Sequence, residues 1–392
     1  MRKLASVQKV LNVRPIEGAD LIEVVDVLGW SVVVKKGEFA VGDLCVYYEI
    51  DSFLNATDPR YATFEERFIN WGDKRGMRLK TIKLRKQVSQ GLVLRLAQFP
   101  EIKNPTEGDD VTEALKIEKW ESLHESHGNS GGMGVKTAGS KPFPSFIRKT
   151  DQERVQNYIT ELPKHIAETF EVSVKLDGSS MTIFRIDRSS PNFAYAWEDI
   201  ETRLLRKKSK LGRFFYKLLK TVGLKRPPQF LDGVCSRNIQ LDTNGDNHFS
   251  KYVAKESILE RLENLGKNFA IQGELIAPSI QENYEKVSDY EFYVYDIFDI
   301  DNQKYLLPWE CRAYCSELGL DHVPVLFEEA NLVTFAKPGA GDARGLVDGI
   351  LEFAEGPGMN PGVKREGVVF KSNAADWSFK AISNSYLLKK KD

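Results

Sequence analysis

The sequence predicts an α+β protein in which a small OB-like β-barrel precedes a larger domain of antiparallel sheets flanked by helices. The first hundred residues contain short β-rich runs separated by glycines, which is typical of a small barrel. From about residue 143 onward, strand and helix patterns mix. Between these regions the segment 128–141 is rich in Gly, Ser and Asn, as linkers are. We therefore expect a barrel over 1–120, a Gly-rich linker over 121–142 and a second domain over 143–392.

The composition is that of an ordinary globular protein without a strong charge bias. The chain has 392 residues, a formal net charge of −1, 42% hydrophobic and 28% charged residues. A surface for nucleic acid must therefore be a local patch. Four scattered cysteines argue for reduced thiols, and no apolar run has the length of a membrane span or a signal-peptide core. We expect an intracellular, soluble protein, cytoplasmic or nuclear, without a membrane or obligate protein partner.

The expected strands of the first domain are short and end at glycines. Gly29, Gly37 and Gly42 separate the first three of them. A basic run over 74–86 gives this barrel either a nucleic-acid-binding edge or simply a solvated strand face. The expected strands cover residues 24–27, 31–34, 44–48, 77–84 and 91–96.

The second domain opens with a helical pattern over 151–166, followed by a strand. Apolar and polar residues alternate from Phe170 to Asp177, which is the two-residue period of a half-buried strand. This alternation places Lys175 and Asp177 on the polar face. An Asp-Gly turn at Asp177–Gly178 follows at once, so the lysine amine should lie at the rim of a sheet.

A strongly basic segment runs from Arg203 to Arg226. It holds ten Lys and Arg residues and no acidic residue, with apolar residues interleaved at helical spacing. Such an amphipathic helix binds phosphates or an anionic membrane surface; the alternative is a surface helix whose basic face lies in water. In a chain of balanced charge it is the best candidate for a nucleic-acid patch, with contacts from Arg206, Lys207, Lys208 and Lys210.

The run Lys175-Leu176-Asp177-Gly178 is a weak signal by itself, because Asp-Gly is a common turn. It gains weight from five segments that follow it in order and that carry charged or aromatic groups. They are Ser236-Arg237-Asn238, the strand 270–275 with Glu274, the aromatic strand 292–297, the strand 366–371 with Glu366 and Lys371, and the segment 377–384 with Lys380.

This set and order of motifs resemble the covalent nucleotidyltransferases, which are polynucleotide ligases and mRNA capping enzymes. ATP-dependent DNA ligases and capping enzymes of this superfamily carry their OB domain after the transferase domain, whereas only about a dozen residues follow Lys380 here. A barrel placed first resembles RNA ligases with an N-terminal OB module and a C-terminal adenylyltransferase domain. The segment 143–157 also resembles the start of RNA ligase transferase domains.

The resemblance implies a nucleotidyltransferase domain with an ATP-grasp-like ligase fold over 143–392. It implies an ATP-dependent RNA ligase that joins a 3′-OH to a 5′-phosphate through lysyl-AMP and polynucleotide-adenylate intermediates. RNA, or an RNA-containing nicked duplex sealed during RNA repair, would be the partner. A DNA ligase and a capping-type guanylyltransferase are alternatives that the domain order disfavours. A nucleic-acid-binding protein with an inactive transferase domain is a third alternative.

The chemistry explains why these residue types are needed. Lys175 must attack the α-phosphorus of ATP as a neutral amine, so its pKa must fall, and a nearby Mg²⁺ or Mn²⁺ favours that form. By resemblance, Asp177, Glu274 and Glu366 hold the cation through its hydration shell. Lys371 and Lys380 stabilise negative charge on the α-phosphate.

The same resemblance assigns the rest of the ATP site. Phe292 would stack on the adenine with Val369 on the opposite face, and Val174 and Arg237 would complete the site. Many RNA ligases carry Lys-x-Lys in the last motif, but Ser378 stands two residues before Lys380. One phosphate contact is therefore missing or is supplied elsewhere, for instance by Lys371.

Overall fold

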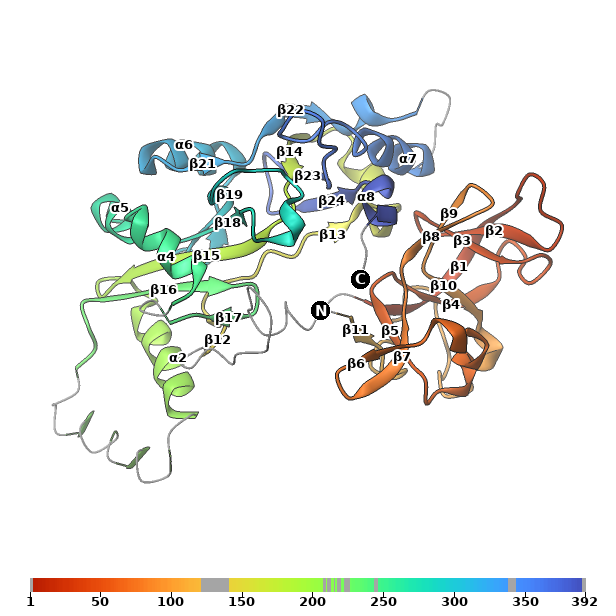
Figure 1. The fold of residues 1–392 in the computed structure, drawn as a ribbon, viewed down its shortest axis with the longest axis horizontal. Helices are drawn as coiled ribbons and strands as arrows, with labels where there is room; N and C mark the ends of the chain where they lie inside the picture. The colour runs from red at the N-terminus through yellow and green to blue at the C-terminus, as the bar shows by residue number, and fades with distance from the viewer. Residues whose placement is uncertain are drawn as a thin grey trace.

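A computed structural model describes residues 3–120, 141–206, 209, 213–214, 216, 220–221, 226–242, 246–337 and 343–389. In Figure 1 the red and orange strands at the N-terminal end lie to one side of the remaining strands and helices. No helix within the described residues is long and apolar enough to cross a membrane.

The N-terminal part is a curled arrangement of antiparallel strands (Figure 1). Its first strand causes the curl, because residues 5–9 pair with one neighbour, β4, and residues 10–15 pair with another, β2. A five-stranded sheet has the order β10-β4-β1-β2-β3, a four-stranded sheet the order β11-β5-β7-β6, and β8 pairs with β9. The bounds are β1 Ala5–Pro15, β2 Ile22–Val27, β3 Trp30–Lys35, β4 Leu44–Tyr48, β5 Ser52–Asn55, β6 Ile69–Trp71, β7 Lys74–Arg78, β8 Thr81–Leu84, β9 Gln87–Gln90, β10 Leu92–Arg95 and β11 Glu118–Lys119.

Two further sheets face each other in the rest of the chain. The larger has the order β12-β17-β16-β15-β18-β19-β20, with β21 paired to β19, and the smaller has the order β13-β24-β23-β14-β22. The bounds are β12 Lys141–Pro142, β13 Glu153–Arg154, β14 Thr169–Lys175, β15 Ser179–Asp187, β16 Phe230–Ser236, β17 Ile239–Gln240, β18 Phe269–Ile276, β19 Glu291–Asp299, β20 Lys304–Tyr305, β21 Asp321–His322, β22 Val325–Asn331, β23 Gly367–Ser372 and β24 Ser378–Ile382.

Helices cover the outer faces of these sheets. Side chains of α4, α5 and α6 form one core with β18 and β19, and α7 packs with β14, β23 and β24 in another. The helix bounds are α2 Phe193–Arg206, α4 His248–Lys255, α5 Ile258–Leu265, α6 Pro308–Leu318, α7 Ala343–Phe353 and α8 Asn384–Lys389. Short 3₁₀ helices are η1 Pro59–Arg67, η2 Leu96–Gln98, η3 Val155–Tyr158, η4 Leu162–His165, η5 Gln281–Asn283 and η6 Leu332–Phe335.

The crossing from one sheet to the other places the motif lysine. β14 ends at Lys175 in the smaller sheet, and β15 begins at Ser179 in the larger one. Gly178 lies at the crossing, where an added Cβ would come within 2.6 Å of the Leu275 carbonyl oxygen. Only glycine allows the backbone to approach β18 so closely. The amine of Lys175 therefore projects at the junction of the two sheets.

Two expectations about secondary structure were wrong. The segment 151–166 is not one helix but β13 followed by η3 and η4, because Pro163 lacks an N–H group and a continuous helix cannot pass through it. β14 is buried on both faces rather than half-buried. Its Glu171, 1% exposed, forms an ion pair with Arg312 of α6, which allows a charged residue inside the sheet.

The basic segment overlaps the end of α2, which begins at Phe193 and ends at Arg206, and most of residues 207–225 lie outside the described part of the chain. Arg203 is 4% exposed and does not lie on a solvated face. It pairs with Asp199 (Nε–Oδ2 2.7 Å) and donates to Gln240 Oε1 (2.7 Å) and to the Pro142 carbonyl (2.9 Å). Arg206 is the last residue of α2, and Lys207, Lys208 and Lys210 lie outside the described residues.

The barrel and the second part are in direct contact. The backbone N–H of Gly29 donates to the Gln156 carbonyl (2.8 Å), and Trp30 Nε1 donates to Asn157 Oδ1 (2.6 Å). Farther along β3, Arg344 of α7 donates to Ser31 Oγ (2.9 Å). The barrel is thereby held beside the junction of the two sheets.

Candidate active site

A cavity of about 780 Å³ lies at the junction of the two sheets and reaches the barrel. Most of the residues that the sequence singles out meet there from strands distant in the chain. Those that line it are Val174, Lys175, Asp177, Arg237, Glu274, Val369, Lys371 and Lys380.

Lys175 is held by a carboxylate from the neighbouring strand. Its Nζ donates to Glu366 Oε2 at 2.7 Å, because Lys175 pairs with Gly367 and Glu366 directly precedes that residue. Burial alone would lower the pKa of Lys175, but Glu366, Glu274 and Asp177 outweigh it and raise the pKa above its ordinary value. The amine is therefore charged here, and its use as a nucleophile requires positive charge to be added near the carboxylates.

The other carboxylates surround the turn after Lys175. Glu274 Oε1 accepts the Gly178 N–H at 3.1 Å, and burial, followed by the charges of Glu366 and Asp177, raises the pKa of Glu274 to about 8 against the pull of Lys175. No group of three or more His, Cys, Asp or Glu within the described residues is close enough to bind a metal directly. This spread donor set fits a cation that keeps its waters, as Mg²⁺ does, rather than a directly ligated one.

The two later lysines face the same cavity from paired strands. Lys371, 8% exposed, forms an ion pair with Asp296 (2.7 Å) and also donates to the Tyr295 carbonyl. Lys380 Nζ lies 3.3 Å from Asp151 Oδ1. Although burial would raise it, the charges of Lys380, Arg237 and Lys119 hold the pKa of Asp151 below its ordinary value.

The pairing of β23 with β24 bears on position 378, where Ser378 stands in place of the first lysine of a Lys-x-Lys motif. Lys371 lies directly opposite Ser378, and Val369 lies opposite Lys380. Residues opposite each other in an antiparallel pair share a face of the sheet. Lys371 therefore occupies the face on which a lysine at position 378 would lie.

Phe292 does not line the cavity, which differs from the expectation that it stacks on adenine. It is 3% exposed and packs in the core beneath the helices, with its ring centre 6.3 Å from that of Tyr252. Successive residues of a strand face opposite sides, and Tyr295 lines the cavity from the other face of β19. Its hydroxyl lies 2.8 Å from Ser180 Oγ.

Several residues at the site were not found from the sequence. Glu285, 1% exposed, accepts the Asp177 N–H with Oε1 (3.2 Å), and a hydrogen bond joins the Tyr386 hydroxyl to Asp177. Arg78 and Trp120 reach the cavity from the barrel, with the Arg78 guanidinium 3.7 Å from the Trp120 ring centre. Arg78 belongs to the basic run 74–86, which from the sequence is a candidate nucleic-acid-binding edge of the barrel. Nothing in the sequence pattern marks Glu285.

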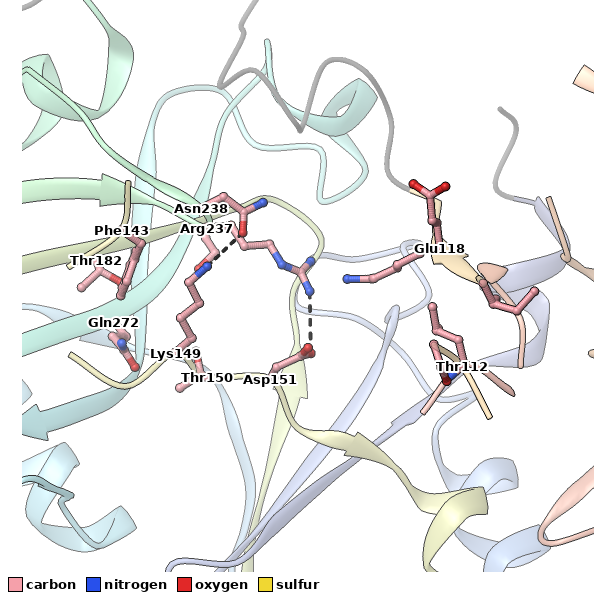
Figure 2. Close-up of a pocket in the computed structure, with 14 residues that line it drawn as sticks. Thr112, Glu118, Phe143, Lys149, Thr150, Asp151, Thr182, Arg237, Asn238 and Gln272 are labelled. Atoms are coloured by element: carbon pink, nitrogen blue, oxygen red, sulfur yellow. Dashed lines mark hydrogen bonds and ion pairs between the residues drawn. The ribbon is translucent and has the colours of Figure 1, made fainter. Parts of the chain in front are cut away.

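A second cavity, of about 490 Å³, lies between the barrel and the sheets. Thr112 and Lys119 of the barrel line one side, and Lys149 and Arg237 line another. Figure 2 shows Lys149 directed at Asn238 (3.1 Å) and Arg237 at Asp151 (3.6 Å). The two cavities share five lining residues and are therefore adjacent: Thr150, Asp151, Ser180, Arg237 and Asn238.

Comparison with known proteins agrees with this architecture. A family model described as an OB-fold domain matches residues 4–96, and one described as RNA ligase matches residues 168–386. The expected OB-like barrel ahead of a ligase domain is thus confirmed. No curated protein matches the chain.

Solved structures of an RNA ligase from Naegleria gruberi resemble the whole chain. A complex with PPi has a TM-score of 0.79 and 38% identity, covering 99% of this chain and 98% of that one. A glutamate-to-alanine mutant with ATP and Mn has a TM-score of 0.78 and 38% identity, covering 100% of both chains. A lysine-to-methionine mutant with AMP and Mn has a TM-score of 0.79 and 38% identity, covering 98% of both chains.

Proposed function

The chain belongs to the RNA ligase family, and we propose that it uses ATP to join a 3′-OH to a 5′-phosphate through lysyl-AMP and polynucleotide-adenylate intermediates. The observation that carries the proposal is the position of Lys175. It lies at the junction of two sheets, 2.7 Å from Glu366, in a cavity that also contains Glu274, Lys371 and Lys380. The similar ligase was solved with ATP or AMP and Mn, which supports the same substrate and a divalent cation here.

The first step requires a neutral lysine. A divalent cation, when bound, would offset the negative charge that now raises the pKa of Lys175. Asp177, Glu274 and Glu366 would hold it through water, because they are too far apart for direct ligation. Lys175 Nζ then attacks the α-phosphorus, the bond to the β-phosphate oxygen breaks, and pyrophosphate leaves.

Two transfers follow. A 5′-phosphate oxygen attacks the lysyl-AMP, breaking the bond between nitrogen and phosphorus and forming a 5′–5′ pyrophosphate link. The 3′-OH then attacks the 5′-phosphate, AMP leaves, and a phosphodiester bond remains. Lys371 and Lys380 would exchange their carboxylate partners, Asp296 and Asp151, for phosphate oxygens and so stabilise developing charge.

For the nucleotide itself we propose a site between Val174 and Val369, with Arg237 at its edge. Of the aromatic residues of β19, Tyr295 rather than Phe292 lines this space. The adenine would therefore contact Tyr295 and Val369.

RNA is the proposed partner, and a nicked duplex sealed in RNA repair the proposed substrate. Arg206, Lys207, Lys208 and Lys210 belong to a segment that carries ten basic and no acidic residues, which suits a phosphate backbone. Replacing these four residues by alanine should weaken binding of a nicked duplex while lysine adenylylation continues. Equal loss of both activities in a folded variant would count against an RNA-binding role.

A sealing assay separates the candidate functions. The protein is incubated with ATP, Mg²⁺ or Mn²⁺ and a nicked duplex whose 5′-phosphate strand is labelled. We expect adenylylated RNA as an intermediate and a sealed strand as product. Preference for a DNA-only nick would favour a DNA ligase, and binding without adenylylation an inactive domain. In a parallel incubation with α-labelled nucleotides, labelling of the protein by GTP in place of ATP would favour a guanylyltransferase.

A further inference from the structure

Gln272 of β18 lines the second cavity with an unsatisfied acceptor. Its side chain is 1% exposed, and Nε2 donates to the Arg148 carbonyl at 2.8 Å, which fixes the orientation of the amide. Oε1 is buried and has no hydrogen-bond partner among the described residues. In Figure 2, Gln272 and Thr182 lie on the side of the cavity away from Thr112 and Glu118 of the barrel.

A buried acceptor without a donor is costly, so a donor group that enters the cavity is favoured at this position. Leaving such a group unpaired costs about 1–3 kcal/mol, which is why few buried polar groups lack partners. A ligand hydroxyl or N–H that enters the cavity would satisfy Gln272 Oε1. The amide is neutral, so it suits an uncharged donor rather than a phosphate.

The neighbours of Gln272 connect it to the reaction centre. Thr182 lies directly opposite Gln272 across the β15–β18 pair, and Ser180 lies opposite Glu274. All four residues therefore share one face of the sheet, with Gln272 about 7 Å along the strand from Glu274. A group that contacts Gln272 is thus next to the place where the proposed AMP transfer occurs.

We propose that Gln272 Oε1 accepts a hydrogen bond from the ribose of the nucleotide at the 3′-OH end of the RNA, and so favours RNA over DNA at that position. This inference rests on the proposed ligase function. The neutral surface of Gln272 and Thr182 matches the 3′ end of RNA, which carries two adjacent hydroxyls and no terminal phosphate. The cations Lys149 and Arg237, elsewhere around the cavity, suit the 5′-phosphate instead.

The test isolates the last chemical step. Nicked duplexes carrying a pre-adenylylated 5′ end are sealed by protein without ATP, with either ribose or 2′-deoxyribose at the 3′-OH nucleotide. The wild-type protein should seal the ribose nick faster. In Gln272→Met this preference should shrink by about tenfold, the size expected when a buried acceptor loses its partner. Lysine adenylylation and the KM for ATP should stay unchanged.

Tyr305→Phe is the matched control. The Tyr305 hydroxyl also donates to the Arg148 carbonyl (2.8 Å), and Tyr305 does not line the cavity. This variant loosens Arg148 as Gln272→Met does but keeps Oε1, so it should retain the wild-type preference for ribose. Equal loss of preference in both variants would overturn the proposal, because it would assign the effect to Arg148.

Three further results would overturn the inference while leaving the ligase function intact. In the first, the wild-type protein seals both nicks equally fast. In the second, Gln272→Met loses only a preference for ribose on the 5′-phosphate side of the nick. In the third, the sole defect of Gln272→Met is a raised KM for ATP. Failure of the proposed function is distinct from all of these, since it would appear as wild-type protein that forms no lysyl-AMP.

Discussion

At the scale of single residues, the protonation of Lys175 determines when the site can react. Its pKa is raised because Glu366, Glu274 and Asp177 favour the charged amine more than burial disfavours it. The same carboxylates are suited to hold a hydrated cation. Its positive charge would offset theirs and so lower the pKa of Lys175 again. Under the proposed mechanism Lys175 becomes a nucleophile only when a divalent cation is bound, so lysine adenylylation should depend on the cation.

Glu274 gives a prediction about pH. Its pKa is raised from 4.5 to about 8 in the folded protein, first by burial. Between pH 4.5 and about pH 8, Glu274 has lost its proton in the unfolded chain but keeps it in the folded protein. The free energy of unfolding of the wild type therefore falls as pH rises through this range. Glu274→Gln removes this titration, and its stability relative to wild type should increase from pH 5 to pH 8 by roughly 3–4 kcal/mol. Urea denaturation without divalent metal measures it; a constant difference across that range would contradict it.

Glu285 supports the turn that carries Asp177. Glu285→Ala leaves the Asp177 N–H without its acceptor and should slow lysine adenylylation about tenfold. Glu285→Gln keeps a side-chain oxygen that can accept this bond and should retain most of the rate. Single-turnover labelling with ATP measures both variants. Equal defects in the two would show that the negative charge, not the hydrogen bond, matters.

At the scale of elements, local patterns predicted strands better than helices. Runs of β-branched and aromatic residues identified β2, β3 and β4, and the Asp-Gly turn correctly marked the end of β14. The helix expected over 151–166 failed because Pro163 and the pairing of β13 with β24 override local periodicity. β1, which pairs on both edges, was missed because polar residues interrupt its apolar pattern.

The residues of the candidate site also divide into those that a local motif marks and those that only the tertiary structure reveals. Lys175, Glu274, Glu366, Lys371 and Lys380 follow from motifs and meet as expected. The face of β19 could not be predicted, because aromatic residues occur on both faces of Phe292-Tyr293-Val294-Tyr295 and a register shift in the β18–β19 pair lies beside them. Contacts such as Glu285 with Asp177 depend on a loop 108 residues away in sequence, which no local pattern records.

Arg203 gives an element-scale prediction. It joins α2 to β12 and β17 through Asp199, Pro142 and Gln240. Arg203→Ala removes the ion-pair partner of Asp199 Oδ2, although Ser145 still donates to Oδ1, and leaves Gln240 Oε1 and the Pro142 carbonyl without a donor. The free energy of unfolding should fall by about 3 kcal/mol. Arg213→Ala, at an exposed position of the same basic segment, is the control and should change it little. Urea denaturation compares them, and equal stabilities would refute the structural role of Arg203.

At the scale of the whole molecule, the barrel is part of the site rather than an appendage. Arg78 and Trp120 line the cavity that contains Lys175, and Thr112 and Lys119 line the adjacent one. These residues lie there because Gly29 and Trp30 hold the barrel against Gln156 and Asn157. The position of the barrel is therefore expected to influence ligation as well as stability.

Gly29→Ala tests that coupling. A Cβ at Gly29 would lie 2.7 Å from the Gln156 backbone, so the barrel must shift away. We expect a larger radius of gyration by X-ray scattering and slower nick sealing. Gly37→Ala is the control, because alanine at φ +74° strains the backbone while its Cβ meets no atom within 4 Å. An unchanged radius and sealing rate in Gly29→Ala would show that the contact does not set the domain position.

The central claim is that Lys175 forms the covalent bond to AMP. Wild-type protein incubated with α-labelled ATP and Mg²⁺ or Mn²⁺ should retain label after denaturation, whereas Lys175→Ala should retain none. Lys304→Ala, at an exposed position of β20, controls for loss of a surface lysine and should label normally. Labelling of Lys175→Ala at the wild-type level would contradict the account.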